Sequence, residues 1–387
     1  MKITDVQACV IGRPEPHSGG CVWTFVRVYT DEGIVGTGEC NSAGAGCSGF
    51  ALKEAILSMK PLLVGKDPTN IGPLYETLRR RGRYGGTTGA PLIFALTGIE
   101  NALHDIVGKA LGVPVYQLLG GKFRDRIRLY ADCHAGESNE PQAYADKALE
   151  VIAEGYSAVK FDVDHAGPGK LDAYNWTVGA KEMTNVIDLI LTTRESIGYE
   201  IDLAIDCHGQ FDMPSAITLA KAVEDTRLLW LEEPIPAENI DALAQVRAAT
   251  STVICTGENH YTRFQFLELL YKQATDVIMP DLAKAGGIRE GKLIADIADA
   301  HYVPIAPHNV SSPLGMITAA HIMAAVPNFL VLEFHGRDIP WWEDLCDGPK
   351  PYIRDGWMEV PELPGIGVEL NDRVAKSLLW HGDTYFD

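Results

Sequence analysis

Residues 204–211, AIDCHGQF, lead from an apolar run that is typical of a buried strand into a pair of ionisable side chains. Asp206 and His208 are two positions apart, so their side chains project from the same face of a strand. Two later apolar runs also end in acids, LLWLEEP at Glu232 and TVICTGE at Glu258. Three carboxylates at the ends of consecutive strands predict a site for one hard divalent cation, most simply Mg²⁺.

Short apolar or β-branched runs recur at regular intervals after residue 125. They cover residues 127–133, 158–164, 201–207, 228–234, 252–258, 276–282, 303–308 and 329–335. Helix-like patterns separate most of them, and their starts lie mostly 24–31 residues apart, with one interval of 43. Alternating strands and helices indicate a parallel sheet, and eight such units predict a (β/α)₈ barrel of the α/β class. A doubly wound open sheet is the alternative, but no glycine fingerprint follows the first strand.

The rest of the chain lacks this regular alternation of strand-like and helix-like patterns. Near the N-terminus, a strand-like start and a hairpin signal at Asp31-Glu32-Gly33 precede helical patterns near residues 51–63, 69–80 and 91–111. Three segments are therefore expected. They are an α+β capping domain at residues 1–125, a (β/α)₈-type barrel at residues 126–346, and a segment at residues 347–387 that packs back on the capping domain.

The composition argues against several classes of protein. A formal net charge of -19 is unlike that of a nucleic-acid-binding surface. No apolar run approaches the roughly 18 residues of a membrane helix, and the start lacks the pattern of a signal peptide. The eight cysteines are scattered without a CxxC pair, which favours reduced thiols. We therefore expect a cytoplasmic enzyme with a small-molecule substrate and with neither a nucleic acid nor a membrane as partner.

Polar side chains crowd the ends of seven of the predicted strands. They are Lys160, Asp162, Asp206, His208, Glu232, Glu258, Asp281, His308 and Glu333. Burying such groups costs several kcal/mol unless they are paired or bind a metal. Any one of them has an ordinary structural explanation, such as a helix cap or a satisfied core histidine. Their coincidence on successive strands favours a shared catalytic pocket, because active sites of such barrels lie at the C-terminal ends of the strands.

The order of these motifs resembles the mandelate racemase subgroup of the enolase superfamily. The matching motifs are Lys160-x-Asp162, Asp206-x-His208, Glu232-Glu233-Pro234, Gly257-Glu258-Asn259, Pro280-Asp281 with Gly286-Gly287, and Pro307-His308. The resemblance implies that Asp206, Glu232 and Glu258 bind Mg²⁺. It also implies that His308 is a general base that is hydrogen-bonded to Asp281, a pairing that would raise the pKa of the imidazole.

Two positions discriminate within this family. Asp162 stands where racemases and cycloisomerases of this type commonly carry the second lysine of Lys-x-Lys, which weakens the case for racemisation. His208 resembles the acid of galactonate and gluconate dehydratases, which expels a hydroxide. Glu333 matches a position where the family often places an acid near the enolate oxygen.

The combination predicts a Mg²⁺-dependent dehydratase that converts an aldonate into a 2-keto-3-deoxy acid through an enediolate. His308 would remove the C2 proton, and His208 would protonate the departing 3-hydroxyl. Lys160 would contact the substrate carboxylate. Asp162 would orient Lys160 or His208, bind a substrate hydroxyl, or simply form an ion pair with Lys160.

Substrate contacts outside the barrel and the assembly state are also predicted. His17 and Tyr84 lie in segments that would cap the barrel, and either could reach the distal hydroxyls. The resemblance implies a homo-oligomer. Three alternatives stay open: an epimerase, racemase or cycloisomerase on the same scaffold, a non-catalytic metal-binding barrel, and a metal-dependent hydrolase. The last would be expected to show an HxH pattern early in the barrel, and none occurs.

Overall fold

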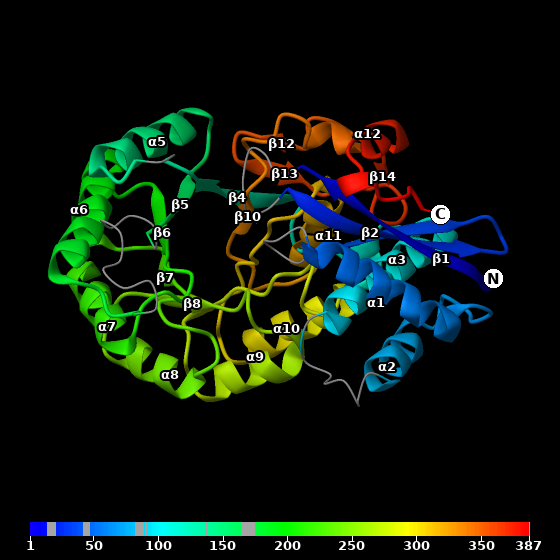
Figure 1. The fold of residues 1–387 in the computed structure, drawn as a ribbon, viewed down its shortest axis with the longest axis horizontal. Coiled ribbons are helices and arrows are strands. Elements are labelled where there is room, and N and C mark those ends of the chain that lie inside the picture. The colour runs from blue at the N-terminus through cyan, green and yellow to red at the C-terminus, as the bar shows by residue number, and fades with distance from the viewer. Residues whose placement is uncertain are drawn as a thin grey trace.

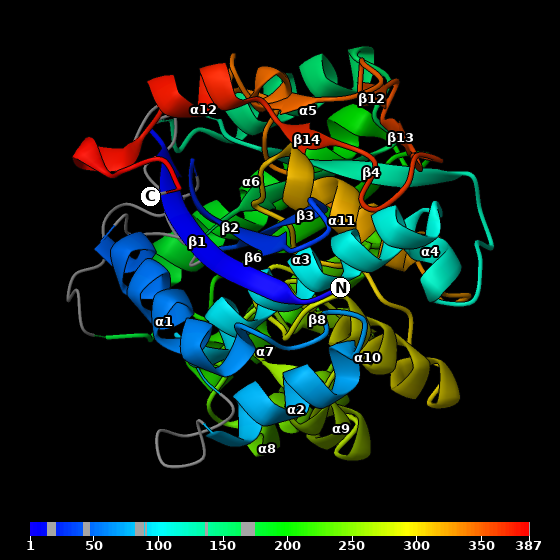
Figure 2. The ribbon, with the colours of Figure 1, turned by 90° about the vertical axis from the view of Figure 1, so that its right-hand side faces the viewer.

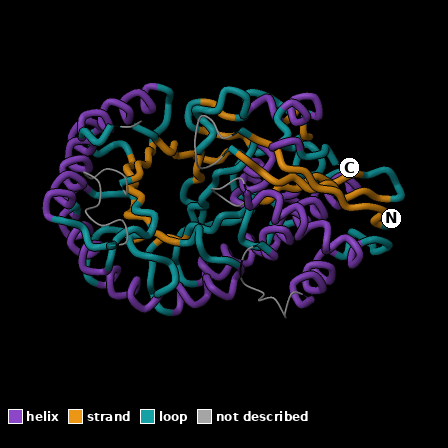
Figure 3. Tube along the Cα trace, viewed as in Figure 1, coloured by secondary structure: helices purple, strands orange, loops and turns teal. Residues whose placement is uncertain are grey.

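The computed structural model describes residues 1–13, 21–41, 47–81, 89, 91–135, 138–163 and 175–386, with only the backbone described at residues 47, 48 and 81. A ring of parallel strands lies inside a ring of helices (Figure 1 and Figure 3). The strands are β4 (Arg126–Cys133), β5 (Ala158–Asp162), β6 (Asp202–Asp206), β7 (Trp230–Glu232), β8 (Ile254–Thr256), β9 (Val277–Ile278) and β10 (Leu332–Phe334). This arrangement is the predicted α/β barrel.

Pairing between the first and last strands closes the ring. Strands β4 to β9 pair in sequence order, and β10 pairs in parallel with β4. Between β9 and β10, single parallel bridges join Ile305 to Ile278 and to Phe329. An open doubly wound sheet would leave its two edge strands apart, so the closure excludes that alternative.

Helices cover the outside of the barrel and follow the strands in alternation. They are α5 (Pro141–Ala153), α6 (Ala180–Ile197), α7 (Met213–Ala222), α8 (Ile240–Ala248), α9 (Thr262–Tyr271), α10 (Ile288–Ala300) and α11 (Pro313–Ala324). Several begin at a capping side chain, as where Asp212 accepts a hydrogen bond from the Ser215 N–H and Asn239 accepts one from the Ala242 N–H. Within the described ranges, no helix is long and apolar enough to cross a membrane.

An antiparallel sheet and helices form the N-terminal unit, which lies beside the barrel in Figure 1 and in front of it in Figure 2. The sheet has the order β1 (Ile3–Gly12), β2 (Val22–Thr30) and β3 (Val35–Cys40), and α1 (Cys47–Leu63), α2 (Ile71–Arg81), α3 (Leu92–Leu111) and α4 (Val115–Leu118) follow it. The predicted hairpin is confirmed, with Gly33 at φ +78° in its turn. Gly38 lets α3 lie close against β3, because a Cβ there would come within 2.1 Å of the Gly98 carbonyl oxygen.

The chain after the barrel contacts both the barrel and the N-terminal unit. Its elements are β11 (Cys346–Asp347), β12 (Ile353–Arg354), β13 (Trp357–Glu359), β14 (Glu369–Leu370) and α12 (Asp372–Ser377). Strand β13 pairs in an antiparallel manner with β4. Asp383 accepts a hydrogen bond of 2.8 Å from the Val10 N–H and pairs with Lys53 at 2.5 Å. The domain boundaries at residues 125 and 346 stay our proposal.

Two buried glutamates of the N-terminal unit cap helices of the barrel. Glu39 on β3 accepts hydrogen bonds of 3.0 Å from the Ser312 and Gly315 N–H groups at the start of α11. Glu100 on α3 accepts hydrogen bonds from the Ile288 and Arg289 N–H groups at the start of α10, at 2.6 and 3.1 Å. A carboxylate is favourable there because the first N–H groups of a helix have no partner within it. These contacts hold the cap against the barrel.

The substitution Glu100→Ala is expected to lower the free energy of unfolding by about 1–2 kcal/mol, because the Arg289 N–H loses its acceptor and the Ile288 N–H keeps only its 3.2 Å hydrogen bond to Asn101 Oδ1. Glu100→Gln is the matched control, since its carbonyl oxygen can still accept and the loss should be smaller. Denaturant unfolding of the three proteins measures the difference. Equal stability of Glu100→Ala and the unsubstituted chain would contradict this account of the interface.

His321 on α11 makes stability depend on pH. Its Nε2 lies 2.9 Å from the Ile366 carbonyl oxygen, and burial lowers the pKa of the imidazole to about 4 from 6.5. Between these values, the unfolded chain binds a proton that the folded chain does not. The free energy of unfolding therefore falls as the pH falls through this window, by up to about 3 kcal/mol for this one group. Denaturant unfolding at several pH values should show a shallower dependence for His321→Gln, and an unchanged dependence would refute the assignment.

Candidate active site

Inside the barrel, the polar side chains form a layer next to an apolar layer, on the side of the C-terminal ends of the strands. The apolar layer contains Tyr130, Ala158, Ala204, Trp230, Met279, Ala306 and Val331, all buried. Two positions further along the same strands or strand ends stand Asp132, Lys160, Asp206, Glu232, Asp281, His308 and Glu333. Alternate residues of a strand share a face, and the residues of the apolar layer face the barrel interior. Each of these polar side chains therefore also points into the barrel. The structure thus brings together most of the side chains that the sequence predicts for the site.

Lys160 is the central cation of this layer. Its Nζ lies 2.7 Å from Glu333 Oε1, 3.1 Å from Asp206 Oδ2 and 3.4 Å from Glu232 Oε1. Burial alone would lower the pKa of Lys160, but the charges of Glu232 and Glu333 raise it well above its usual value. Within the described chain, its ion pairs do not include Asp162, so the suggested Lys160–Asp162 pair is not formed.

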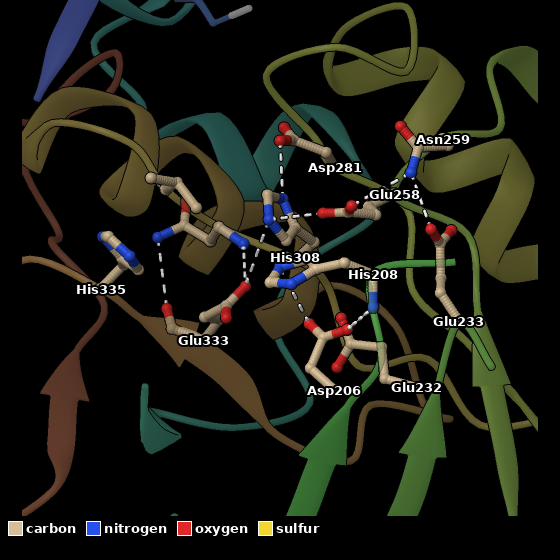
Figure 4. Close-up of polar contacts among 12 residues, drawn as sticks. Asp206, His208, Glu232, Glu233, Glu258, Asn259, Asp281, His308, Glu333 and His335 are labelled. Atoms are coloured by element: carbon tan, nitrogen blue, oxygen red, sulfur yellow. Dashed lines mark hydrogen bonds and ion pairs between the residues drawn. The ribbon is translucent and has the colours of Figure 1, made fainter. Parts of the chain in front are cut away.

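His308 is held between two acids. Its Nδ1 lies 2.8 Å from Asp281 Oδ2, which is the predicted pairing, and its Nε2 lies 2.7 Å from Glu258 Oε2. Burial opposes protonation, but the charge of Glu258 raises the pKa of His308 well above its usual value. Asp281 is fixed in turn by Lys284, at 3.2 Å, and by a hydrogen bond of 2.8 Å from the Ala283 N–H. Asp281 therefore fixes the orientation of the imidazole through Nδ1, and Nε2 faces Glu258 in the pocket (Figure 4).

The three carboxylates predicted to bind metal stand on successive strand ends. Asp206 and Glu232 are buried, and the Glu258 side chain is 13% exposed. Burial, followed by the charge of Asp206, raises the pKa of Glu232 well above its usual value. So many buried oxygens, only partly balanced by Lys160 and His308, suit a hard divalent cation.

The tightest clusters of ligand atoms are, however, different ones. In the described residues, the groups whose ligand atoms all lie within 4.8 Å of one another are Asp162, Asp206 and His208, and Asp132, His134 and His335. Glu232 and Glu258 belong to neither group. Glu258 instead has its Oε2 against His308 and accepts a hydrogen bond of 3.1 Å on Oε1 from Asn259. The assignment of the three predicted metal ligands stays a prediction.

His208 follows the end of β6 and lies beside Asp206 (Figure 4). It has a left-handed backbone, with φ +45°, and its side chain is 39% exposed. Its backbone N–H donates to Asp206 Oδ1 at 2.9 Å, and its Nε2 lies 3.6 Å from Asp206 Oδ2. Burial and the charge of Asp132 raise the pKa of the neighbouring Asp162 well above its usual value. His208 also lines a cleft of about 770 Å³, together with Gln210, Glu233 and Asn259.

Glu333 lies between Lys160 and His308 and contacts both. Besides its ion pair with Lys160, its Oε2 accepts a hydrogen bond of 2.7 Å from the Asn309 N–H and lies 3.8 Å from His308 Nε2. Glu233 belongs to a separate network, in which Asn259 and Thr256 donate to it at 2.7 and 3.2 Å. Glu233 thus has its own partners beside the pocket.

Two predicted substrate contacts, His17 and Tyr84, lie outside the described residues. Conversely, sequence reasoning missed Lys284, Asp132, His134 and His335. A signal for two of them was present, because Asp132-Cys133-His134 repeats the Asp-Cys-His order of residues 206–208 at the end of another strand. Lys284 carries no comparable signal, since its role depends on how the loop after β9 folds back on Asp281.

Family comparisons agree with this geometry. The N-terminal domain of the mandelate racemase/muconate lactonizing enzyme family matches residues 19–120, and the enolase C-terminal domain-like family matches residues 143–374. The chain belongs to the mandelate racemase/muconate lactonizing enzyme family of the enolase superfamily. The resemblance seen in the ordered motifs is thereby confirmed, as is the barrel with an N-terminal cap.

Relatives in this family include sugar-acid dehydratases. The D-xylonate dehydratase of Haloferax volcanii is 42% identical over 387 residues, which cover 100% of this chain and 91% of that protein. The D-galactonate dehydratase of Xanthomonas oryzae pv. oryzae is 34% identical over 92% of this chain and 90% of that protein. The crystal structure of a mandelate racemase/muconate lactonizing enzyme-like protein from Rubrobacter xylanophilus superposes with a TM-score of 0.94, at 43% identity, over 100% of this chain and 99% of that one.

Proposed function

We propose that this protein dehydrates an aldonate to a 2-keto-3-deoxy acid, and that it requires Mg²⁺. The observation that carries the proposal is the placement of two imidazoles about one cluster of carboxylates. His308 approaches from the side of Asp281 and Glu258, and His208 from the side of Asp206 (Figure 4). Removal of a proton and departure of a hydroxide need a base and an acid on different parts of one substrate. The dehydratase relatives support the same reaction.

The proposed reaction divides between the two histidines. His308 takes the C2 proton on Nε2, because Nδ1 is committed to Asp281. The ring must be neutral for this step, so Glu258, which lies 2.7 Å from Nε2 and favours the protonated imidazole, would have to release that atom to the substrate. The electron pair of the C2–H bond forms the enediolate, and collapse of the enediolate breaks the C3–O bond. His208 gives its proton to the departing oxygen, which leaves as water. The resulting enol gains a proton at C3 and tautomerises to the 2-keto acid.

Other residues bind and orient in this scheme. Asp206, Glu232 and Glu258 would hold Mg²⁺, whose charge, when it is bound, stabilises the enediolate. Lys160 places positive charge beside Glu333 and the predicted metal ligands, so it limits repulsion between these acids and an anionic substrate. Asp162 lies close enough to His208 to orient it. A cytoplasmic location and a homo-oligomer remain predictions.

The substitution His208→Asn tests the assignment of the acid. We expect turnover to fall by about 10²–10⁴-fold, while exchange of the C2 proton with solvent deuterium persists because His308 is intact. Product is measured as the semicarbazone of the 2-keto acid, and exchange by mass spectrometry. His301→Asn, at an exposed position on the outside of the barrel, is the control. Unchanged dehydration by His208→Asn would refute the acid assignment. Deuterium uptake without loss of water in the unsubstituted protein would favour an epimerase instead.

A further inference from the structure

A second cluster of histidine and carboxylate side chains lies where the barrel closes. Asp132 and His134 stand at and just beyond the end of β4, and His335 directly follows β10. Because β10 pairs with β4 in parallel and Phe334 lies opposite Ala131, His335 falls beside Asp132 at the same edge. Figure 4 shows His335 on the far side of Glu333 from Asp281 and Glu258. None of the three residues has a role in the proposed dehydration.

The donor atoms converge at distances that suit a shared ion. His134 Nε2 lies 3.3 Å from His335 Nε2, and His335 Nε2 lies 3.3 Å from Asp132 Oδ2. The two rings meet at an interplanar angle of 80°. Two ligands held at about 2.0–2.1 Å around a tetrahedral ion lie roughly 3.3 Å apart, so little movement is needed for all three atoms to share one cation.

The carboxylate of this cluster is buried and incompletely bonded. The Asp132 side chain is 6% exposed, and its Oδ1 has no hydrogen-bond partner among the described residues. The Asp132 residue stands opposite Lys160 in the β4–β5 pairing, and its Oδ2 lies 3.3 Å from His335 Nε2. A buried anionic oxygen without a donor is costly, and an ion at this place would satisfy it.

We propose that Asp132, His134 and His335 form a second cation site that takes a zinc-class divalent ion. Two imidazole nitrogens and one carboxylate oxygen are ligands that Zn²⁺, Co²⁺ and Ni²⁺ prefer. Mg²⁺ prefers oxygen ligands, which Asp206, Glu232 and Glu258 supply. The ligands of the proposed zinc-class site therefore differ in chemistry from the predicted Mg²⁺ ligands. Three protein ligands leave a coordination position for water or for a hydroxyl group of a bound molecule. The ion would also tie the first strand of the barrel to the last.

Zinc binding by the full-length protein tests the proposal without any substrate. The protein is stripped with chelator, loaded with Zn²⁺ in excess Mg²⁺, desalted, and analysed for zinc content. Isothermal titration with Zn²⁺ gives the affinity. Three variants are compared with the unsubstituted protein. His134→Asn removes a ligand of this cluster, and Glu232→Gln removes a predicted Mg²⁺ ligand. His301→Asn removes an exposed imidazole elsewhere.

We expect His134→Asn to hold one zinc ion fewer per chain than the unsubstituted protein, or to bind the ion at least about tenfold more weakly. Glu232→Gln and His301→Asn should keep this ion. Asp132→Asn, which is nearly isosteric, should repeat the loss if His134→Asn folds poorly. Zinc content that is the same in all variants would overturn the proposal. Loss of turnover in His134→Asn or Asp132→Asn without any zinc in the unsubstituted protein would also overturn it, and would assign the cluster to hydrogen bonding. Absence of dehydratase activity would leave the zinc result unaffected.

Discussion

Replacing His308 by asparagine is expected to lower kcat for aldonate dehydration by about 10²–10⁴-fold, the range found when a positioned general base is removed. In the proposed mechanism, His308 Nε2 takes the C2 proton, while Asp281 holds Nδ1 at 2.8 Å. Asparagine keeps a polar side chain of similar reach but has no basic nitrogen. Exchange of the C2 proton with solvent deuterium should disappear together with turnover. Product formation and deuterium uptake, measured on the same samples, give both results.

The control for this prediction is His301→Asn, which removes an exposed imidazole on the outer face of the barrel. Thermal unfolding of both variants guards against loss of activity through loss of the fold. The combination with His208→Asn is informative, because only His308→Asn should abolish exchange. A His308→Asn protein that still exchanges the C2 proton at the original rate would show that another group is the base.

The substitution Glu232→Gln is expected to weaken Mg²⁺ binding by more than about 100-fold, since loss of even an outer-shell contact commonly costs about 10–100-fold in metal affinity. Glu232 is fully buried, with Lys160 3.4 Å from one oxygen and the Trp230 indole N–H donating to the other at 2.9 Å. Glutamine preserves the shape but removes the charge that a hard cation requires. Isothermal titration with Mg²⁺ gives the affinity, and turnover should recover in part at high Mg²⁺ concentration.

Glu233→Gln is a matched control, because it makes the same change at the next residue. Glu233 is buried like its neighbour but bonds to Asn259 and Thr256, and burial raises its pKa to about 7. Its carboxylate is thus held by Asn259 and Thr256, and it is not one of the predicted metal ligands. We expect Glu233→Gln to bind Mg²⁺ nearly as well as the unsubstituted protein. Equal binding by Glu232→Gln would remove Glu232 from the set of metal ligands.

Much of the fold follows from local sequence pattern. The spacing of apolar runs predicted the barrel, and the polar residue that follows each run predicted which side chains meet, because alternation along a strand is a local property. The helices near residues 51–63, 69–80 and 91–111 appear as α1, α2 and α3, with ends shifted by a few residues. The ordered motifs then distinguished this family from other barrels.

Other features depend on contacts that no local pattern encodes. The seventh predicted strand, residues 303–308, is reduced to bridges at Ile305, because Pro304 and Pro307 lack the N–H groups that extend a ladder. Lys160 forms ion pairs with three acids on strands far apart in the sequence, and no local pattern predicts these pairs. Its contact with the substrate carboxylate stays a prediction. The capping of α10 by Glu100 joins residues separated by 188 positions.

The most direct test of the account is turnover by the purified protein with Mg²⁺ on a panel of aldonates that includes xylonate, galactonate, gluconate and arabinonate. Formation of a 2-keto-3-deoxy acid is read as its semicarbazone, with His308→Asn and His208→Asn measured in parallel. The account predicts product from at least one aldonate, lost on removal of Mg²⁺ and in both variants. Mg²⁺ binding without product from any member of the panel would contradict it and would favour an epimerase or a non-catalytic barrel.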